Sequence, residues 1–385
     1  MKAAFLLMAS AAIAANVYVF WRIWTTVPGG IAAKCCVCAL YALWEASFFL
    51  ARRHLGSLPV RAATPLYEIS NTWIIAFLYI LLAFLIIDIA GLIYPSAKGL
   101  LHNSLAGTVF VTCAVALVLF CGNRHYHHKY REEMTMEASG AAASRAVALG
   151  ASGAAGVRIV LASDLHLGYH NRRDELARWI DLINAENPDL VLFGGDIIDI
   201  SVKPLIEGNY AEEFHRLKAP AFAVLGNHEF YSGNKRAEQF YRDAGITLLR
   251  DSVALVDGIA IIGRDDRTNA DRLPLSEILA RYGIGTEELA AEGPDGAKPF
   301  TILLDHQPTN LEDAERCGID FQFSGHTHRG QVWPVSWVTD AIFEKSWGQH
   351  RRGNTRYYVS SGLGIWGAKV RIGTRSEYLV LKLQR

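Results

Sequence analysis

The sequence predicts an α/β domain that follows a helical membrane region. Long apolar runs fill the first third of the 385-residue chain, whereas short apolar runs that end in Asp, Asn or His recur after residue 157. A helical pattern at 175–186 lies between the first two of these short runs, as in an α/β sheet. We therefore expect three parts: a transmembrane region at 1–133, an Ala/Gly/Ser-rich linker at 134–156 and an α/β domain at 157–385.

Four apolar runs approach the roughly 20 residues that a helix needs to cross a bilayer. They lie at 3–21, 31–51, 72–94 and 100–122. Buried helices of a soluble domain alternate with polar faces, and these runs have almost none, so we expect an all-α region of four spans. The first run also fits a signal peptide, although it is long for one.

Two acidic residues interrupt the spans, Glu45 in the second and Asp88 in the third. A carboxylate inside a membrane segment is a functional hypothesis by default. Helix-packing hydrogen bonds or a position near the end of a span explain these two equally well. We assign them no role.

The basic residues of the short loops predict the orientation in the membrane. An even number of spans puts seven of them on one side: Lys2, Arg52, Arg53, Arg61, Arg124, Lys129 and Arg131. Basic loops stay in the cytoplasm, so we expect a multi-pass protein of the cell (inner) membrane with the domain at 157–385 in the cytoplasm. The tract 124–131, rich in His, Tyr and Arg, is interpreted as a cluster at the lipid headgroups rather than a metal site.

The charges and the cysteines exclude two classes of protein. The chain has 38 Lys/Arg and 38 Asp/Glu, with a net charge of +5 over 1–133 and −5 over 134–385, so neither part has the basic excess of a nucleic-acid-binding protein. No CxxC pair stands near a histidine, so a zinc finger is excluded. A lone thiol at Cys317 fits a reducing compartment.

Polar residues follow five successive strand-type runs in the C-terminal part. The first run, 158–163, leads into Asp164 and His166, and the second, 190–193, leads into Asp196. The third, 221–225, leads into Asn227 and His228. The fourth, 301–304, leads into Asp305 and His306, and the fifth, 321–323, leads into His326 and His328. Each pair alone also fits a turn or a helix cap. Five in succession favour one shared site, because ligands of α/β sheets gather beyond the carboxyl ends of the strands.

The chemistry of these side chains favours metal ions. They offer carboxylate and amide oxygens and imidazole nitrogens without a thiolate, which suits two divalent ions, Mn, Fe or Zn, better than a structural zinc site built on cysteine. A carboxylate that bridges two ions about 3.5–4 Å apart fits phosphoryl transfer, because the pair clamps the oxygens of an in-line displacement.

Taken together, the motifs DLHLG (164–168), GGDIID (194–199), GNHE (226–229), LDHQP (304–308) and GHTHRGQ (325–331) resemble the calcineurin-like metallophosphoesterase superfamily in order and spacing. The stretches 359–364 and 370–377 are similar to its bacterial membrane-associated branch, which often carries N-terminal transmembrane helices. The resemblance covers 157–385 and implies a four-layer α/β/β/α sandwich.

The resemblance also implies a role for individual residues. The first metal ion would bind Asp164, His166, Asp196 and His328, and the second Asp196, Asn227, His306 and His326. His228 matches the family's catalytic histidine beside the scissile phosphate, and Asp199 matches the acid that hydrogen-bonds it. Arg329 stands where the branch more often has Gly, so it is either a phosphate contact or a solvated loop residue.

The implied activity is hydrolysis of a phosphate ester or anhydride by a metal-activated hydroxide. A membrane anchor favours a lipid or lipid-linked substrate, and the aromatic residues Trp333, Trp337, Phe343, Trp347 and Trp366 either form an apolar lip for its chain or pack the edge of a sheet. The alternative is a soluble nucleotide or a phosphoprotein as substrate, with the membrane region serving only for localisation. A non-catalytic scaffold is disfavoured, since every motif position is intact.

Overall fold

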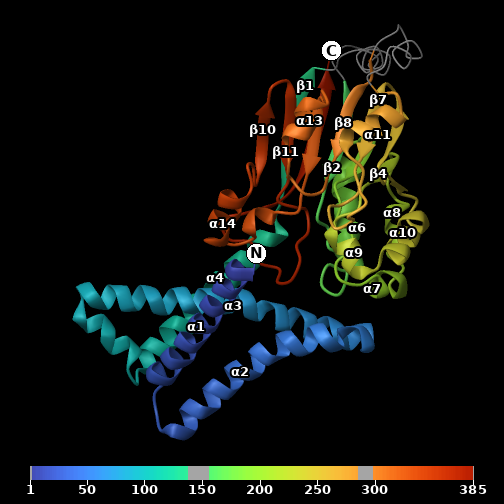
Figure 1. Ribbon diagram of the computed structural model, residues 1–385. Coiled ribbons are helices and arrows are strands. Elements are labelled where there is room, and N and C mark those ends of the chain that lie inside the picture. Colours follow the sequence, from blue (N-terminus) through green and yellow to red (C-terminus); the bar gives the residue numbers. More distant parts are fainter. Residues whose placement is uncertain (1, 138–155, 285–297, 385) are drawn as a thin grey trace. The chain divides into compact units, whose positions relative to one another are not determined.

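A computed structural model describes residues 2–137, 156–284 and 298–384 of the chain (Figure 1). The chain divides into two compact units. One consists of Met1–His125 with Gly367–Val370, and the other of Tyr126–Trp366 with Arg371–Arg385.

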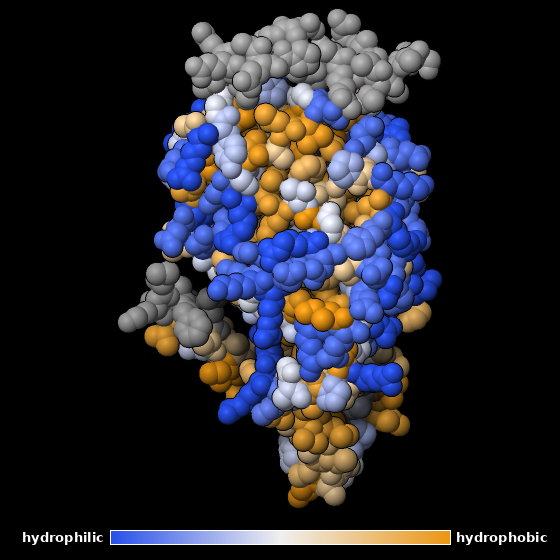
Figure 2. All heavy atoms as spheres, turned by 90° about the vertical axis from the view of Figure 1, so that its right-hand side faces the viewer, coloured by the Kyte–Doolittle hydropathy of each residue, from blue (hydrophilic) through white to orange (hydrophobic). Residues whose placement is uncertain are grey.

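The first unit is helical. Its long helices are α1 (Lys2–Thr26), α2 (Ile31–His54), α3 (Val60–Ile93) and α4 (Leu105–His127), with the short 3-10 helices η1 (Leu55–Ser57) and η2 (Pro95–Leu101) between them. Figure 2 shows apolar residues over much of the visible surface of these helices, whereas many hydrophilic residues cover the visible face of the second unit.

The expected number of spans needs a correction from four to three. Among the described residues, three segments are long and apolar enough to cross a membrane: Ile31–Ser57, Val60–Ile93 and Leu105–His127. The predicted first span is a helix, α1, but its second half carries Asn16, Arg22, Thr25 and Thr26, which lower its hydropathy. The three segments fit a membrane protein.

Both acidic residues of the spans bind polar side chains of α1. The Asn16 amide donates to Glu45, while Tyr18 and Arg22 donate to Asp88. Polar side chains between apolar helices stabilise their association, because an unpaired group would face hydrocarbon. The two carboxylates thus join α1 to α2 and to α3, which explains the polar residues that lower the hydropathy of α1.

The second unit contains two six-stranded sheets. The first has the order β1-β12-β2-β3-β4-β5, with β1 (Lys129–Glu137), β12 (Ser376–Gln384), β2 (Val157–Ala162), β3 (Leu190–Phe193), β4 (Ala221–Ala223) and β5 (Thr247–Leu248). The second has the order β10-β11-β9-β8-β7-β6, with β10 (Gly348–Arg352), β11 (Thr355–Val359), β9 (Phe321–Ser324), β8 (Phe300–Leu304), β7 (Ile259–Gly263) and β6 (Ser252–Val256).

Parallel pairing orders the centre of both sheets. β2, β3, β4 and β5 are parallel in the first sheet, and β7, β8, β9 and β11 in the second. Antiparallel pairs join β12 to β2, β6 to β7 and β10 to β11. The strand-type runs that the sequence predicted correspond to β2, β3, β4, β8 and β9, so their carboxyl ends meet at one edge of each sheet.

The helices of this unit lie between the strands in the sequence. They are α6 (Arg173–Ala185), α7 (Lys203–Glu207), α8 (Ala211–Phe214), α9 (Asn227–Ser232), α10 (Asn234–Asp243), α11 (Leu275–Arg281), α13 (Glu312–Arg316), the 3-10 helix η4 (His328–Gly330) and α14 (Val335–Ile342).

Three buried apolar clusters define four layers. Residues such as Leu161 of the first sheet and Ile302 of the second share a cluster, so the sheets pack face to face. The opposite face of the first sheet packs on α6 through Ile180, and that of the second packs on α11 through Ile278. The predicted α/β/β/α sandwich is confirmed.

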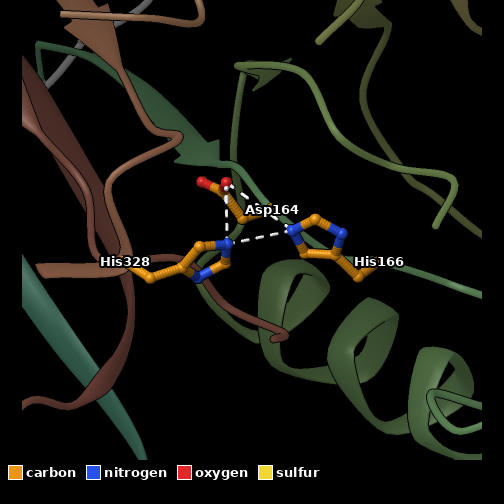
Figure 3. A group of neighbouring side chains, drawn as sticks. All are labelled: Asp164, His166 and His328. Atoms are coloured by element: carbon orange, nitrogen blue, oxygen red, sulfur yellow. Dashed lines mark hydrogen bonds and ion pairs between the residues drawn. The ribbon is translucent and has the colours of Figure 1, made fainter. Parts of the chain in front are cut away.

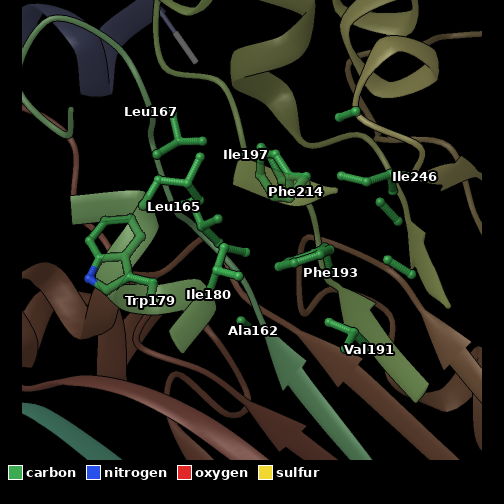
Figure 4. Close-up of a cluster of buried hydrophobic side chains, with 14 of the residues drawn as sticks. Ala162, Leu165, Leu167, Trp179, Ile180, Val191, Phe193, Ile197, Phe214 and Ile246 are labelled. Carbon is green, nitrogen blue, oxygen red and sulfur yellow. The ribbon is translucent and has the colours of Figure 1, made fainter. Parts of the chain in front are cut away.

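Alternation along the first motif separates the site from the core. Leu165 and Leu167 enter the apolar cluster beside Trp179 and Ile180 of α6 (Figure 4). Of the two candidate ligands of this motif, Asp164 precedes Leu165 and His166 lies between the two leucines. The leucines belong to this apolar core, whereas Asp164 and His166, whose backbones have positive φ values, are not part of it.

The first sheet begins earlier than the sequence indicated. β1 pairs in parallel with β12, from Lys129 opposite Ser376 to Glu137 opposite Gln384. Of the linker predicted at 134–156, residues 134–137 belong to this strand, and 138–155 lie outside the described residues. The strand was missed because its mostly charged sequence, KYREEMTME, lacks the apolar pattern of the other strands.

Candidate metal centre

The loops after the parallel strands lie against one another through backbone hydrogen bonds. The Asp164 N–H donates to Gly195 O and the His166 N–H to Asp196 O, each at 2.9 Å. Gly325 N–H donates to His306 O, also at 2.9 Å. These bonds join the first motif to the second and the fourth to the fifth, so residues far apart in the sequence share one site.

Left-handed backbone conformations concentrate in these loops. Asp164, His166, Asp196, His326 and His328 all have positive φ values, between 46° and 69°. Non-glycine residues adopt such values rarely, and strained positions persist where the surrounding structure requires them. Five of the seven candidate ligands therefore have a backbone that aims the side chain at a particular point.

The first cluster consists of Asp164, His166 and His328 (Figure 3). The Nε2 atoms of the two histidines are 3.0 Å apart. Asp164 Oδ1 lies 3.4 Å from His328 Nε2 and 3.8 Å from His166 Nε2. All three side chains are buried. They present one oxygen and two nitrogens to a common point, which is the arrangement of a metal ligand set.

The second cluster consists of Asp196, His306 and His326. Asp196 Oδ2 lies 3.1 Å from His306 Nε2 and 3.7 Å from His166 Nε2, so its carboxylate stands between the two clusters. The fourth candidate, Asn227, joins this cluster through its Oδ1, which is 2.8 Å from His326 Nδ1. The structure thus brings all seven candidate ligands together.

The hydrogen bonds of His306 indicate that its free nitrogen faces a cation site. Its Nδ1 is 2.8 Å from Gly194 O, which only accepts, so Nδ1 carries the proton. In a neutral ring Nε2 then has a bare lone pair, and it points at the Asp196 carboxylate without a hydrogen-bond partner among the described residues. Two electron-rich groups at 3.1 Å repel each other unless a positive charge lies between them, either a metal cation or a proton on Nε2. Burial opposes the protonated form, but Asp196 outweighs it and raises the pKa of His306 well above its usual value.

Buried carboxylates make the centre electron-rich. Burial disfavours the charge of Asp164, yet the neighbouring His328 and His166 hold its pKa below the usual range. Burial also opposes protonation of His166, but Asp164 and Asp199 outweigh it and raise the pKa of this ring to about 10. Burial, with His306 beside it, lowers the pKa of His326 to about 4. The carboxylates attract positive charge, which divalent cations would supply.

Asp199 lies next to both a candidate ligand and the candidate catalytic histidine. Its Oδ1 is 3.0 Å from His228 Nδ1 and 3.5 Å from His166 Nδ1. Burial disfavours its charge, but His166 and His228 lower its pKa well below the usual range. The His228 side chain is 14% exposed, so its other edge can meet a molecule that enters the site.

Comparison with known proteins is consistent with this geometry. The family model described as calcineurin-like phosphoesterase matches residues 157–330. A metallophosphoesterase of Aquifex aeolicus is 30% identical over 232 residues, which cover 59% of this chain and 85% of that protein. This chain belongs to the calcineurin-like metallophosphoesterase family.

Other relatives are longer than the matched region. A metallophosphoesterase of Helicobacter pylori is 31% identical over 231 residues, 59% of this chain and 60% of that protein. A transmembrane protein with metallophosphoesterase domain from Danio rerio is 34% identical over 244 residues, 59% of this chain and 53% of that protein. The match spans less than two thirds of either. Family members use divalent metals, and the clusters described above are candidate sites for them.

Glu229 supports the loop that carries Asp196. Its buried carboxylate accepts backbone N–H groups from Asp196 at 3.1 Å, Ile198 at 2.9 Å and Gly226 at 2.7 Å, and the Tyr241 hydroxyl at 3.0 Å. A carboxylate with four donors holds two neighbouring loops of the phosphoesterase domain in register. Glu229 is the last residue of the GNHE motif, and only the fold shows which groups its carboxylate holds.

Two further supports, Asn171 and Arg371, were not identified from the sequence, although Arg371 lies in the stretch 370–377 noted above. The Asn171 amide donates to Leu165 O, His166 O and Ile365 O at 2.9–3.1 Å. The fully buried Arg371 donates to His328 O and Gly364 O, each at 3.0 Å. Each fixes the backbone beside a candidate ligand to the 361–365 loop. Both lie outside the motifs, and only the fold brings them to the site.

Arg329 stacks on an aromatic ring at the edge of the site. Its guanidinium lies 4.4 Å from the centre of the Trp347 ring, and that of Arg375 lies 4.8 Å from the same centre. Trp347 Nε1 donates to Glu377 Oε1 at 2.9 Å. Trp347 thus contacts two arginines and a buried glutamate, and the Arg329 side chain packs on its ring.

Replacement of Glu229 by Gln should weaken metal binding. An amide offers one acceptor and adds a donor that faces the N–H groups of Asp196 and Gly226. We expect a loss of metal affinity of about 10- to 100-fold, measured by elemental analysis after dialysis against graded metal concentrations. Tyr241→Phe removes one of the four donors and should have a smaller effect. Equal metal affinity in Glu229→Gln and wild type would contradict the role.

Proposed function

We propose that this chain is a membrane-anchored phosphoesterase that hydrolyses a phosphate ester or anhydride with two divalent cations, Mn, Fe or Zn. The observation that carries the proposal is the Asp196 carboxylate, which stands 3.1 Å and 3.7 Å from histidines of two adjacent clusters. One carboxylate shared by two ligand sets suits a metal pair that clamps the oxygens of an in-line phosphoryl displacement.

In this proposal each ion takes four side chains. The first ion binds Asp164, His166, Asp196 and His328, and the second binds Asp196, Asn227, His306 and His326. When bound, the ions supply Lewis acidity, which lowers the pKa of a water and neutralises charge on the phosphoryl oxygens. The chain's contribution is to hold these donors in a buried, rigid arrangement.

His228 and Asp199 supply the protein's own chemistry at the phosphate. Asp199 Oδ1, 3.0 Å from Nδ1, orients the His228 ring. In the imidazolium form the opposite nitrogen is a donor that stabilises a phosphoryl oxygen or protonates the leaving group. We also assign Arg329 to the phosphate as a contact at the edge of the site, because it follows the candidate ligand His328 directly and its guanidinium is held on the Trp347 ring.

Two variants separate metal binding from catalysis. The full chain in detergent with Mn²⁺ should hydrolyse bis(p-nitrophenyl) phosphate or the monoester. Asp196→Asn should abolish both metal binding and hydrolysis, because it removes the shared anion. His228→Ala should keep its metal content and lose roughly 100- to 10,000-fold in kcat, because it removes only the proton donor. An active Asp196→Asn protein would exclude the two-metal assignment.

A lipid or lipid-linked phosphoester is the proposed substrate class. Support comes from chain connectivity: α4, an apolar helix long enough to span a bilayer, ends at His127, and β1 begins at Lys129. So short a connection keeps the phosphoesterase domain within reach of the membrane surface, since each residue spans at most about 3.6 Å. A soluble nucleotide or a phosphoprotein is the alternative.

A comparison of extracted phosphates distinguishes these substrates. Total lipid extract and a water-soluble extract are each incubated with the wild type and with His228→Ala, and the phosphorylated species are resolved by mass spectrometry. We expect a lipid species that the wild type alone consumes. Consumption confined to the water-soluble fraction would transfer the assignment to a soluble substrate.

The cytoplasmic location of the domain is a proposal that the basic loops support. Arg52 and Arg53 lie in the last turn of α2 and Arg61 in the first turn of α3, while Arg124 and Lys129 lie at and beyond the end of α4. Two spans, α3 and α4, separate the groups, so both lie on the same side. With three spans instead of four, Lys2 leaves this set, and the other six basic residues stay together. A cytoplasmic reporter fused after Arg385 should be active. A reporter that works only outside the cytoplasm would reverse the orientation.

A further inference from the structure

Helix α14 has an apolar side that the phosphoesterase domain leaves exposed. Trp337 is 65% exposed, Val338 55% and Ile342 69%. With Ala341 these residues sit at i, i+1, i+4 and i+5, so they share one side of the helix. The buried residue of the helix is the polar Ser336. This pattern is the reverse of a soluble surface helix, whose apolar side faces the core.

The polar groups near α14 are engaged with one another. Within α14, which the structure describes completely, the only acidic residue is Asp340, and the Ser346 hydroxyl donates to its carboxylate. Thr339 donates back to Ser336 O at 2.9 Å. We name the exposed side of this helix the α14 face; it consists of Trp337, Val338, Ala341 and Ile342. None of these four residues carries a charge.

The indole rings at the start of α14 suit a membrane interface. Trp333, 40% exposed, meets Trp337 edge to face, with ring centres 5.4 Å apart and planes at 84°. Tryptophan prefers the boundary between lipid headgroups and hydrocarbon, where one edge of the ring is wet and the rest is apolar. Short helices with Trp and aliphatic residues on one side bind this boundary in the same way.

α14 is fixed to the metal centre at both ends. At its start, a Cβ on Gly330 would lie 2.6 Å from the carbonyl carbon of Val335, so η4 and α14 approach too closely for any other residue. After its end, the Phe343 ring lies 6.2 Å from that of His326, and the Thr327 hydroxyl donates to Ser346 O at 2.6 Å. A contact that fixes the position of α14 therefore also restricts the loop that carries His326.

We propose that the α14 face docks into the headgroup boundary of the bilayer in which this chain's own apolar helices lie. Three observations select a bilayer as the occupant. The same chain has three helices that fit membrane spans, its domain begins two residues after one of them, and the exposed side pairs indoles with uncharged aliphatic residues. Docking would hold the metal centre at the level of lipid phosphates. The docking itself does not depend on the proposed hydrolysis.

Photo-crosslinking tests the docking independently of activity. The full chain with Ile342→p-benzoylphenylalanine is reconstituted into vesicles of phosphatidylethanolamine and phosphatidylglycerol and irradiated. We expect lipid adducts at residue 342, identified by mass spectrometry. The matched control carries the same substitution at Leu255 on β6, which is 56% exposed and apolar but lies at the far edge of the second sheet. It should give about tenfold less adduct.

A second variant tests the face as a whole. Val338→Ser combined with Trp337→Ser should reduce lipid adducts at residue 342 by about tenfold, because two apolar side chains no longer enter the boundary. Unchanged metal content in this variant would show that the fold is intact. Equal lipid adducts at 255 and 342 would overturn the proposal, and so would a crosslink at 342 to a second copy of the chain. Absence of hydrolysis would count against the proposed function and leave these readouts unaffected.

Discussion

The candidate metal centre depends on the position of one carboxylate, that of Asp196. Its Oδ1 accepts the backbone N–H of His228 at 2.9 Å, and its Oδ2 faces His306 and His166. Glu229 holds the Asp196 backbone from the opposite side. A Cβ at Gly226 would lie 2.1 Å from Asp196 Oδ1, so only glycine leaves room for this approach. Three motifs thus converge on one side chain.

The site residues by themselves lower the stability of the folded state, so the rest of the domain has to offset this cost. Buried carboxylates lose their hydration, and non-glycine residues at positive φ are strained, so both effects oppose the folded state. The surrounding structure opposes them with two mixed sheets, parallel at their centres, that share an apolar interior and are covered by helices on their outer faces. Backbone hydrogen bonds between the loops, and the side chains of Asn171 and Arg371, then hold each loop in place. The candidate ligand atoms therefore stay aligned although the carboxylates repel one another.

The membrane helices and α14 extend the same reasoning to substrate access. For the lipid phosphoester proposed above as substrate, the enzyme has to meet the phosphate at the bilayer surface. The direct passage from α4 into β1 limits how far the phosphoesterase domain can move away. The contacts of Phe343 with His326 and of Thr327 with Ser346 couple the apolar helix to the metal motif, so the orientation of one sets that of the other.

Most of the candidate site was predictable from the sequence because its signals are local. A strand-type run followed by Asp, Asn or His is visible in a few residues. The resemblance that five such motifs carry, in order, to the calcineurin-like metallophosphoesterases implied both the α/β/β/α fold and the seven candidate ligands. The supports were not predictable. Asn171, Tyr241 and Arg371 lie outside the motifs, and their partners are mostly backbone groups far away in the sequence.

The sequence by itself determined the apolar helices, the strands and the residue types at their ends, since periodicity and chain direction are properties of the local sequence. Only the tertiary structure decided which groups share a point in space. It added the charged strand β1 to the sheet through its pairing with β12, and it showed that polar residues of α1 serve Glu45 and Asp88. It also turned the apolar side of α14 outward. The physical reason is that burial and hydrogen-bond partners arise from contacts between distant segments, which no local pattern specifies.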